Sequence, residues 1–186
     1  MAPALAAYRR SPASMEPPMP PKPSKSVPAP RLARLRSLAI AGAVATLAAD
    51  LTGQTLSPLL DDLVPGFGPV FDPRPIGEQA LAELSGLDAF RVETLGLGQA
   101  LHVVLGVVVF PALWLFAARP LLARVAPRFR TFGAAAVYGC ALWVAAVWGA
   151  AHVVAGNPPF LGWTSLAWVA LTVHLVYAFT LAAMTR

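Results

Sequence analysis

One carboxylate and three imidazoles lie within otherwise apolar stretches of this sequence, and they are Asp50, His102, His152 and His174. Ionisable groups are costly in apolar surroundings and usually pair with one another or mark a functional site. Imidazole and carboxylate groups can exchange a proton, bind a metal ion or, as two facing histidines, bind haem. The same groups can also simply hold helices together by hydrogen bonds. The residue types therefore allow a proton-linked or small-ligand site, a metal site, or purely structural contacts.

Helical spacing places each of these groups on a face rich in small or polar residues. Asp50 shares its face with Thr46 and Gln54, and His102 shares its face with Gln99 and Gly106. Because small residues let helices approach closely, we expect all four ionisable side chains to point into a bundle. We predict a candidate site that consists of Asp50, His102, His174, His152, Gln54 and Gln99.

The rise of a helix gives the depth at which each group would lie in a membrane. At 1.5 Å per residue, Asp50 and His174 lie about 15 Å from the outer helix ends, His102 about 9 Å and His152 about 3 Å. This estimate predicts that Asp50 meets His174 near mid-membrane. The remaining histidines would then extend a polar column toward the outer face.

The elements that must position these groups are four long apolar segments. The chain of 186 residues is 57% hydrophobic and 12% charged, and the charged share is about half that of a soluble domain. The segments cover residues 37–60, 96–118, 132–154 and 163–185. About 20 helical residues cross the hydrocarbon core of a bilayer. We therefore predict an all-α fold, an integral membrane four-helix bundle, with residues 37–186 as its transmembrane domain.

Positive charge is distributed in a way that indicates the orientation of the bundle. Twelve of the 14 Lys and Arg residues precede the first segment, lie between the second and third, or follow the fourth. The loop 61–95 holds the other two and seven of the nine acids. The positive-inside rule therefore predicts that both termini are cytoplasmic, in an inner (plasma) membrane, with loop 61–95 external.

The N-terminal residues 1–36 contain nine of the 19 prolines and show no apolar periodicity. We expect a disordered, basic, proline-rich cytoplasmic tail whose end contacts the anionic lipid surface. In the external loop, apolar residues recur at helical spacing from Ile76 to Leu87, which predicts a short amphipathic helix. In the second segment Pro111 should kink the helix and free the carbonyl near Val107.

The sequence contains no motif of a known catalytic class: no Walker loop, no dinucleotide fingerprint, no His-Glu-x-x-His and no nucleophile elbow. We therefore expect a protein that is not an enzyme and has no required cofactor. No basic stripe alternates with aromatic residues, so we expect no nucleic-acid partner. The expected partners are the lipid bilayer and, as an option, further copies of the chain or subunits of a membrane complex.

Three short stretches resemble an uncharacterised family of small bacterial four-helix inner-membrane proteins, a domain of unknown function. They are residues 45–50 (ATLAAD), 101–106 (LHVVLG) and 173–177 (VHLVY), and Ala178 stands where that family usually has glycine. The resemblance covers about residues 38–184. It implies the four-helix fold, and it implies that Asp50, His102 and His174 belong to one site. It implies no activity.

These observations lead to three functional hypotheses. The first is a non-enzymatic accessory or small-ligand-binding membrane protein with an Asp/His cluster inside the membrane. The second is an oligomeric proton-coupled transporter or channel. The third is a haem- or copper-binding membrane protein, which needs imidazoles that face one another.

Overall fold

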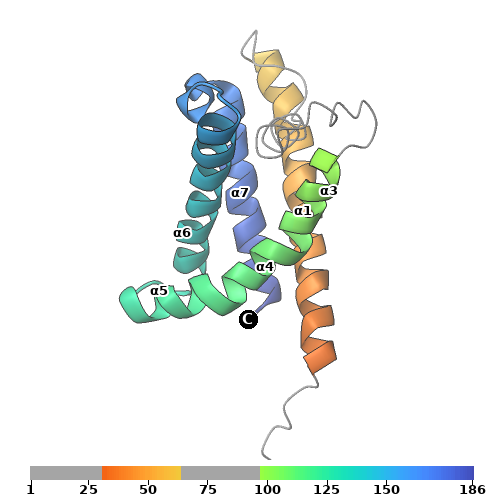
Figure 1. Cartoon of the computed structure of the whole chain (residues 1–186), viewed down its shortest axis with the longest axis vertical. Coiled ribbons are helices and arrows are strands. Elements are labelled where there is room, and N and C mark those ends of the chain that lie inside the picture. The colour runs from red at the N-terminus through yellow and green to blue at the C-terminus, as the bar shows by residue number, and fades with distance from the viewer. Residues whose placement is uncertain (1–30, 64–96) are drawn as a thin grey trace, which may run out of the picture.

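A computed structural model describes residues 31–63 and 97–186, and the regular structure within these ranges is entirely helical. The proline-rich residues 1–30 and the amphipathic helix expected between Ile76 and Leu87 lie outside the described residues. The first helix, α1, spans Arg31–Leu63 and is followed along the chain by a second long helix over residues 97–125. Figure 1 shows the second helix beginning beside α1 and running diagonally to the opposite side of the molecule.

The second helix is continuous but changes its winding several times. It consists of α3 (Leu97–Val104), a π-helical turn η2 (Leu105–Val109), α4 (Phe110–Leu113), a second π-helical turn η3 (Trp114–Ala118) and α5 (Arg119–Val125). The third helix begins as α6 (Thr131–Val144) and continues as a π-helical run, η4 (Ala145–Val154). A short 3-10 turn, η5 (Pro159–Trp163), leads into α7 (Ser165–Met184).

Four of these helices are long and apolar enough to cross a membrane: Ala33–Leu59, Gly98–Val125, Thr131–Val154 and Ser165–Met184. Their outward faces carry large exposed apolar side chains, among them Leu47, Leu51, Val104, Val108, Phe116 and Val153. An exposed apolar surface of this kind is typical of a face covered by lipid. The four segments expected from the sequence are thus confirmed as helices.

Two helix boundaries differ by six residues or more from those expected. The first helix begins at Arg31 instead of Ser37, and the second ends at Val125 instead of Ala118. Residues 31–36 are Arg, Leu and Ala, which are strong helix formers, so nothing interrupts the helix there. Pro120 lies just after the π-helical turn η3, at the start of α5, where a missing N–H is tolerated.

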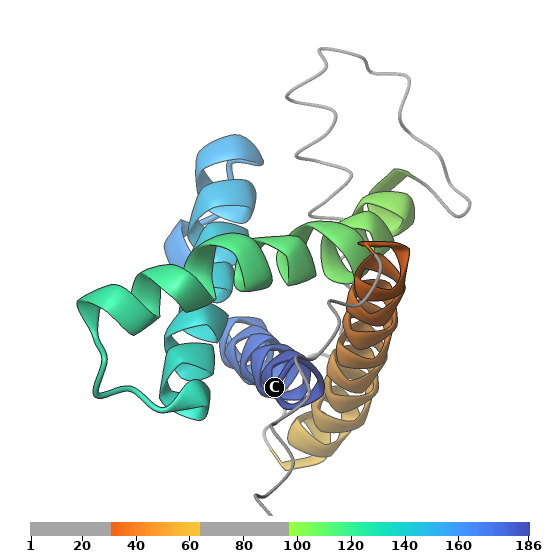
Figure 2. The same cartoon turned by 90° about the horizontal axis from the view of Figure 1, so that it is seen from below.

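The last helix, α7, lies at the centre of the bundle and packs against both α1 and α6. The second helix crosses the other helices obliquely and contacts α1 through η2 and α4 (Figures 1 and 2). We call the end of the bundle with the 126–130 loop and Arg186 the arginine end, and the end with η5 the tryptophan end.

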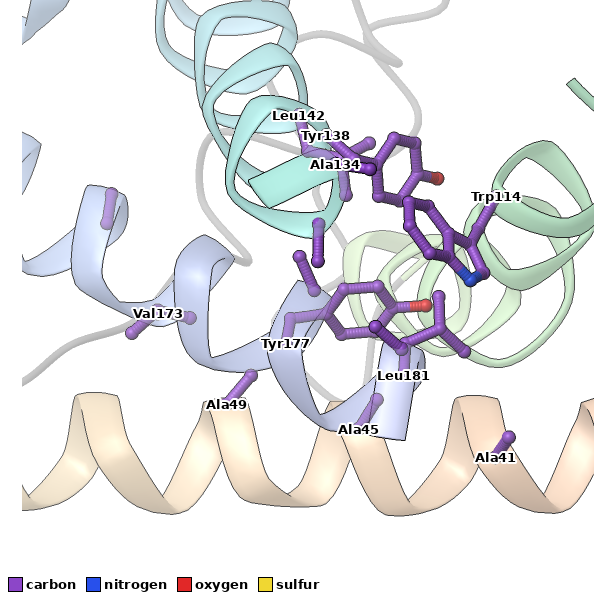
Figure 3. Packing of buried hydrophobic residues seen from close by; sticks show 14 of the residues in the cluster. Ala41, Ala45, Ala49, Trp114, Ala134, Tyr138, Leu142, Val173, Tyr177 and Leu181 are labelled. Carbon is purple, nitrogen blue, oxygen red and sulfur yellow. The ribbon is translucent and has the colours of Figure 1, made fainter. Parts of the chain in front are cut away.

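The core between the helices combines small residues with a few large aromatic ones. Alanines of α1 and α7 are buried and let these two helices approach closely. Trp114, Tyr138 and Leu181 fill the space toward the arginine end, as Figure 3 shows. The indole N–H of Trp114 donates to the Thr185 hydroxyl at 3.0 Å, so this part of the core is also fixed by a polar contact.

The π-helical turn η2 precedes Pro111 and changes which carbonyl is freed. The Phe110 N–H donates to the carbonyl of Leu105, five residues earlier, and Pro111 has no N–H. The carbonyl of Gly106 is thereby left without either of its usual helical donors. The Tyr177 hydroxyl of α7 donates to it at 2.6 Å. The sequence predicted a freed carbonyl near Val107, and the π-helical winding shifts this role to Gly106.

Candidate functional site

Asp50 and His102 form a side-chain pair between α1 and the second helix. The His102 Nε2 lies 3.0 Å from the Asp50 Oδ1. The Asp50 side chain is 39% exposed and that of His102 is 27% exposed, so the pair lies at the margin of the bundle and not in its core. Because a carboxylate only accepts hydrogen bonds, the proton between these atoms belongs to Nε2 of the imidazole.

The glycines of α1 and the second helix set the register of this pair. A Cβ atom at Gly42 would lie 2.5 Å from the Val107 carbonyl oxygen, and a Cβ atom at Gly106 would meet the Thr46 hydroxyl. The two backbones therefore approach as closely as only glycine allows. Thr46 lies one turn before Asp50 on α1, and His102 lies one turn before Gly106 on the second helix. This antiparallel register brings Asp50 onto His102.

The observed partner of Asp50 differs from the one expected from depth. The carboxylate contacts His102, whereas Nδ1 of His174 lies 2.7 Å from the Ala170 carbonyl of its own helix. The depth estimate treats all helices as parallel to the membrane normal. The second helix runs obliquely, so residue counts from its end do not give depth.

His174 and His102 line the same cavity, which has a volume of about 350 Å³. We call it the imidazole cavity. Its other polar side chains are the hydroxyls of Thr46 and Tyr177. The remaining lining residues are apolar, and seven of the 15 are glycine or alanine. They come from all four long helices and, at Leu161, from η5: Ala49, Gly98, Leu101, Leu105, Gly106, Phe110, Leu142, Ala145, Ala146, Val147, Ala150, Leu161, Leu166, Ala170 and Val173.

The shape of the cavity follows from where the second and third helices touch. Near the arginine end the Tyr138 hydroxyl donates to the Phe110 carbonyl at 2.6 Å, and the rings of Trp114 and Tyr138 are 5.4 Å apart. Toward the tryptophan end the two helices separate (Figure 1). Three of the five side chains that the third helix presents there are alanines, Ala145, Ala146 and Ala150, so the space between the helices stays open. The exposed Ala145 also lines the cavity, which therefore reaches the surface of the bundle.

The floor of the cavity is formed by Phe110 and Tyr177, whose rings meet edge to face with centroids 6.1 Å apart. Beneath them lie the buried side chains of Trp114 and Tyr138. The cavity thus ends before the arginine end of the bundle.

The other predicted site residues lie outside the walls of the cavity. His152 contacts the Asn157 carbonyl through Nδ1 at 2.7 Å, and its ring lies 4.9 Å from that of Trp148. His152 therefore fastens the end of η4 to the turn that follows. Gln99 is half-buried on α3, and Gln54 is exposed on α1. Of the six predicted residues, the structure places His102 and His174 in the cavity wall, and Asp50 contacts His102 without lining the cavity.

Sequence reasoning missed the contribution of Tyr177, Thr46 and the alanines of η4 to this site. Tyr177 shares a helical face with His174, so spacing contained a signal for it. The alanines carried no such signal, because an alanine that lines a cavity and one that faces lipid look alike in a sequence. Within residues 31–63 and 97–186, no group of three or more His, Cys, Asp or Glu side chains is arranged to hold a metal ion.

Comparison of the chain with known protein families, curated proteins and solved structures finds no match in any of the three. The cavity is therefore the feature of the chain that bears on its function. Its chemistry is that of a site for a small, largely apolar molecule with at least one polar group.

Proposed function

We propose that this chain is an integral membrane protein that binds a small lipid-soluble molecule in the imidazole cavity. The observation that carries the proposal is the presence of two imidazoles, His102 and His174, in the largely apolar wall of a cavity between four lipid-length helices. Small-molecule sites commonly have volumes of about 300–1,000 Å³, apolar walls and a few polar groups. The volume of about 350 Å³ falls at the lower end of that range.

The position of the cavity suits a ligand that arrives from the bilayer. The cavity reaches the surface of the bundle at Ala145, between the second and third helices, where neighbouring side chains such as Val104 and Val144 are exposed and apolar. A lipid-soluble molecule would meet no charged side chain among the cavity-lining residues of the ranges 31–63 and 97–186. A water-soluble ion would have to leave water before it could enter.

The transporter or channel alternative receives less support from the same geometry. A pathway needs polar groups along the whole thickness of the bundle, but the cavity ends at Phe110 and Tyr177. Beyond them the packed side chains of Trp114 and Leu181 occupy the core. The haem or copper alternative depends only on the two imidazoles, and an absorbance spectrum and a metal analysis of the purified protein would identify it.

The test is ligand recovery from a matched pair of variants. The protein is purified in lipid nanodiscs from its native membranes, and the small molecules that accompany it are identified by mass spectrometry. Ala146→Phe places a ring in the cavity and should abolish recovery, whereas Ala141→Phe adds the same ring at an exposed position of α6 and should retain it. A molecule recovered equally from both variants, or from neither variant nor the wild type, would overturn the proposal.

We also propose that both termini lie on the cytoplasmic side of an inner membrane. Four arginines, Arg119, Arg124, Arg128 and Arg130, gather at the arginine end, and the segment 155–164 at the other end carries no charge. Cationic ends remain in the cytoplasm. In a Cys140→Ser background, a membrane-impermeant maleimide applied to intact cells should label Thr164→Cys and not Pro127→Cys. The reverse pattern would refute the orientation.

A further inference from the structure

The hydrogen-bonding groups in the wall of the imidazole cavity are unevenly divided between donors and acceptors. Both hydroxyls of the wall already donate elsewhere. The Tyr177 hydroxyl donates to the Gly106 carbonyl at 2.6 Å, and the Thr46 hydroxyl donates to the Gly42 carbonyl at 2.9 Å. A ligand in the cavity would therefore find the hydrogens of both hydroxyls in use.

The imidazole of His174 is oriented so that it accepts. Its Nδ1 lies 2.7 Å from the Ala170 carbonyl, which can only accept, so Nδ1 carries the proton. In a neutral imidazole the other nitrogen, Nε2, then carries a lone pair. Within the described part of the chain the structure gives this Nε2 no hydrogen-bond partner.

The imidazole of His102, when it is neutral, likewise has one nitrogen that donates and one that accepts. Its Nε2 donates to the Asp50 carboxylate at 3.0 Å, so Nδ1 carries the lone pair. No residue of the ranges 31–63 and 97–186 contacts that Nδ1 by a hydrogen bond. The neutral cavity thus offers two imidazole acceptors, contributed by two different helices, and no hydroxyl donor that is still available.

On the basis of the proposed function, we infer that the cavity selects a ligand that donates hydrogen bonds: an apolar molecule with an aromatic hydroxyl, of the phenol or quinol class. A quinone, ketone or ether of the same shape would bring a second acceptor toward His174 and would lose its own hydration without compensation. A phenol satisfies Nε2 of His174 with its hydroxyl hydrogen and places its ring against the apolar wall. A quinol also has a hydroxyl hydrogen that it can donate to Nε2 of His174.

The experiment compares three probes that differ in one group: 4-propylphenol, 4-propylanisole and propylbenzene. Binding to the wild-type protein in nanodiscs is measured by thermal stabilisation, after correction for partitioning into empty nanodiscs. One neutral hydrogen bond is worth about 0.5–1.5 kcal/mol, which corresponds to a preference of roughly 2- to 12-fold for the phenol. His174→Phe should abolish this preference. His152→Phe, the same substitution at a histidine outside the cavity wall, should leave it unchanged.

The outcomes separate this inference from the function on which it rests. If none of the probes binds, the proposed ligand site itself is refuted. If all three bind but the anisole equals or exceeds the phenol, or if His174→Phe keeps the preference, the site stands and its donor selectivity is refuted. Should His174→Phe fail to fold, the ¹⁵N resonances of the wild-type histidines replace it. The phenol should then shift Nε2 of His174 and not the nitrogens of His152, and no shift at His174 would overturn the inference.

Discussion

Removal of the Tyr177 hydroxyl would test how the second helix tolerates Pro111. The structure makes this hydroxyl the donor for the Gly106 carbonyl, because Phe110 bonds one residue further back and Pro111 has no N–H. Tyr177→Phe keeps the ring and its edge-to-face contact with Phe110, and removes only the hydrogen bond. The carbonyl would then be buried without a donor from the described residues.

The loss of stability expected for Tyr177→Phe depends on the Gly106 carbonyl having no other hydrogen-bond donor among the described residues. A buried polar group that loses its partner costs about 1–3 kcal/mol. Hydrogen bonds between membrane helices average about 0.6 kcal/mol, with a maximum near 1.7 kcal/mol, because the unfolded chain in the membrane finds other partners. We expect Tyr177→Phe to lower the free energy of unfolding by about 1–2 kcal/mol, near the upper end of the membrane range.

Tyr138→Phe provides the matched control. The Tyr138 hydroxyl also donates to a backbone carbonyl of the second helix, that of Phe110, at 2.6 Å. That carbonyl additionally accepts the N–H of Trp114, so it keeps a partner after the substitution. We expect Tyr138→Phe to cost less than about 0.6 kcal/mol, the membrane average.

The assay is reversible unfolding in mixed micelles of increasing SDS content, followed by tryptophan fluorescence. A double-mutant cycle with Pro111→Ala completes it, because alanine supplies the missing N–H. In the Pro111→Ala background the Tyr177→Phe substitution should cost about 1 kcal/mol less than in the wild type. Equal costs for the two tyrosine substitutions, together with an unchanged cost in the Pro111→Ala background, would refute the explanation of the π-helical turn.

Three further predictions concern the contacts between helices and the position of the third helix. Gly42→Ala should lower the free energy of unfolding by about 1–3 kcal/mol in the same assay, because its Cβ would overlap the second helix. Gly149→Ala should have no such cost, since the space around Gly149 is open; equal costs would contradict the close approach. A double-mutant cycle between Asp50→Ala and His102→Ala should give a coupling of about 0.3–1 kcal/mol, since both groups are partly exposed. No coupling would argue against the pair. Cys140, exposed within a membrane-length helix, should react with a membrane-impermeant maleimide only after denaturing solubilisation; labelling in intact membranes would place it in water.

The sequence was sufficient to predict the helices, because the length of an apolar segment and its sparse charge are properties of the segment alone. It also placed Asp50 and His102 on faces with small residues, and these faces do pack together. The pairing of Asp50 with His174 was wrong because tilt and register depend on where two backbones touch. Those contacts are set by Gly42 and Gly106 jointly, and neither glycine indicates its partner.

The cavity and the π-helical turns could not be predicted for a related reason. A proline such as Pro111 frees a backbone carbonyl, but whether the helix kinks or widens depends on a donor from another helix, here Tyr177. The volume of the cavity depends on the angle between the second and third helices, which is fixed near the arginine end by Tyr138. Neither the angle between these two helices nor the volume of the cavity can be predicted from the local sequence.

The central place of α7 has a consequence for how the bundle is made in the cell. This helix follows the other three along the chain, so it leaves the ribosome after them, yet it is the common neighbour of α1 and α6. Until α7 is inserted, α1 and α6 lack the helix that both of them pack against, although each can already contact the second helix. Their apolar length allows this, because insertion into the bilayer precedes association of the helices. A ribosome stalled before Ser165 would therefore release three inserted helices without the one that joins α1 to α6, an obvious substrate for membrane quality-control proteases.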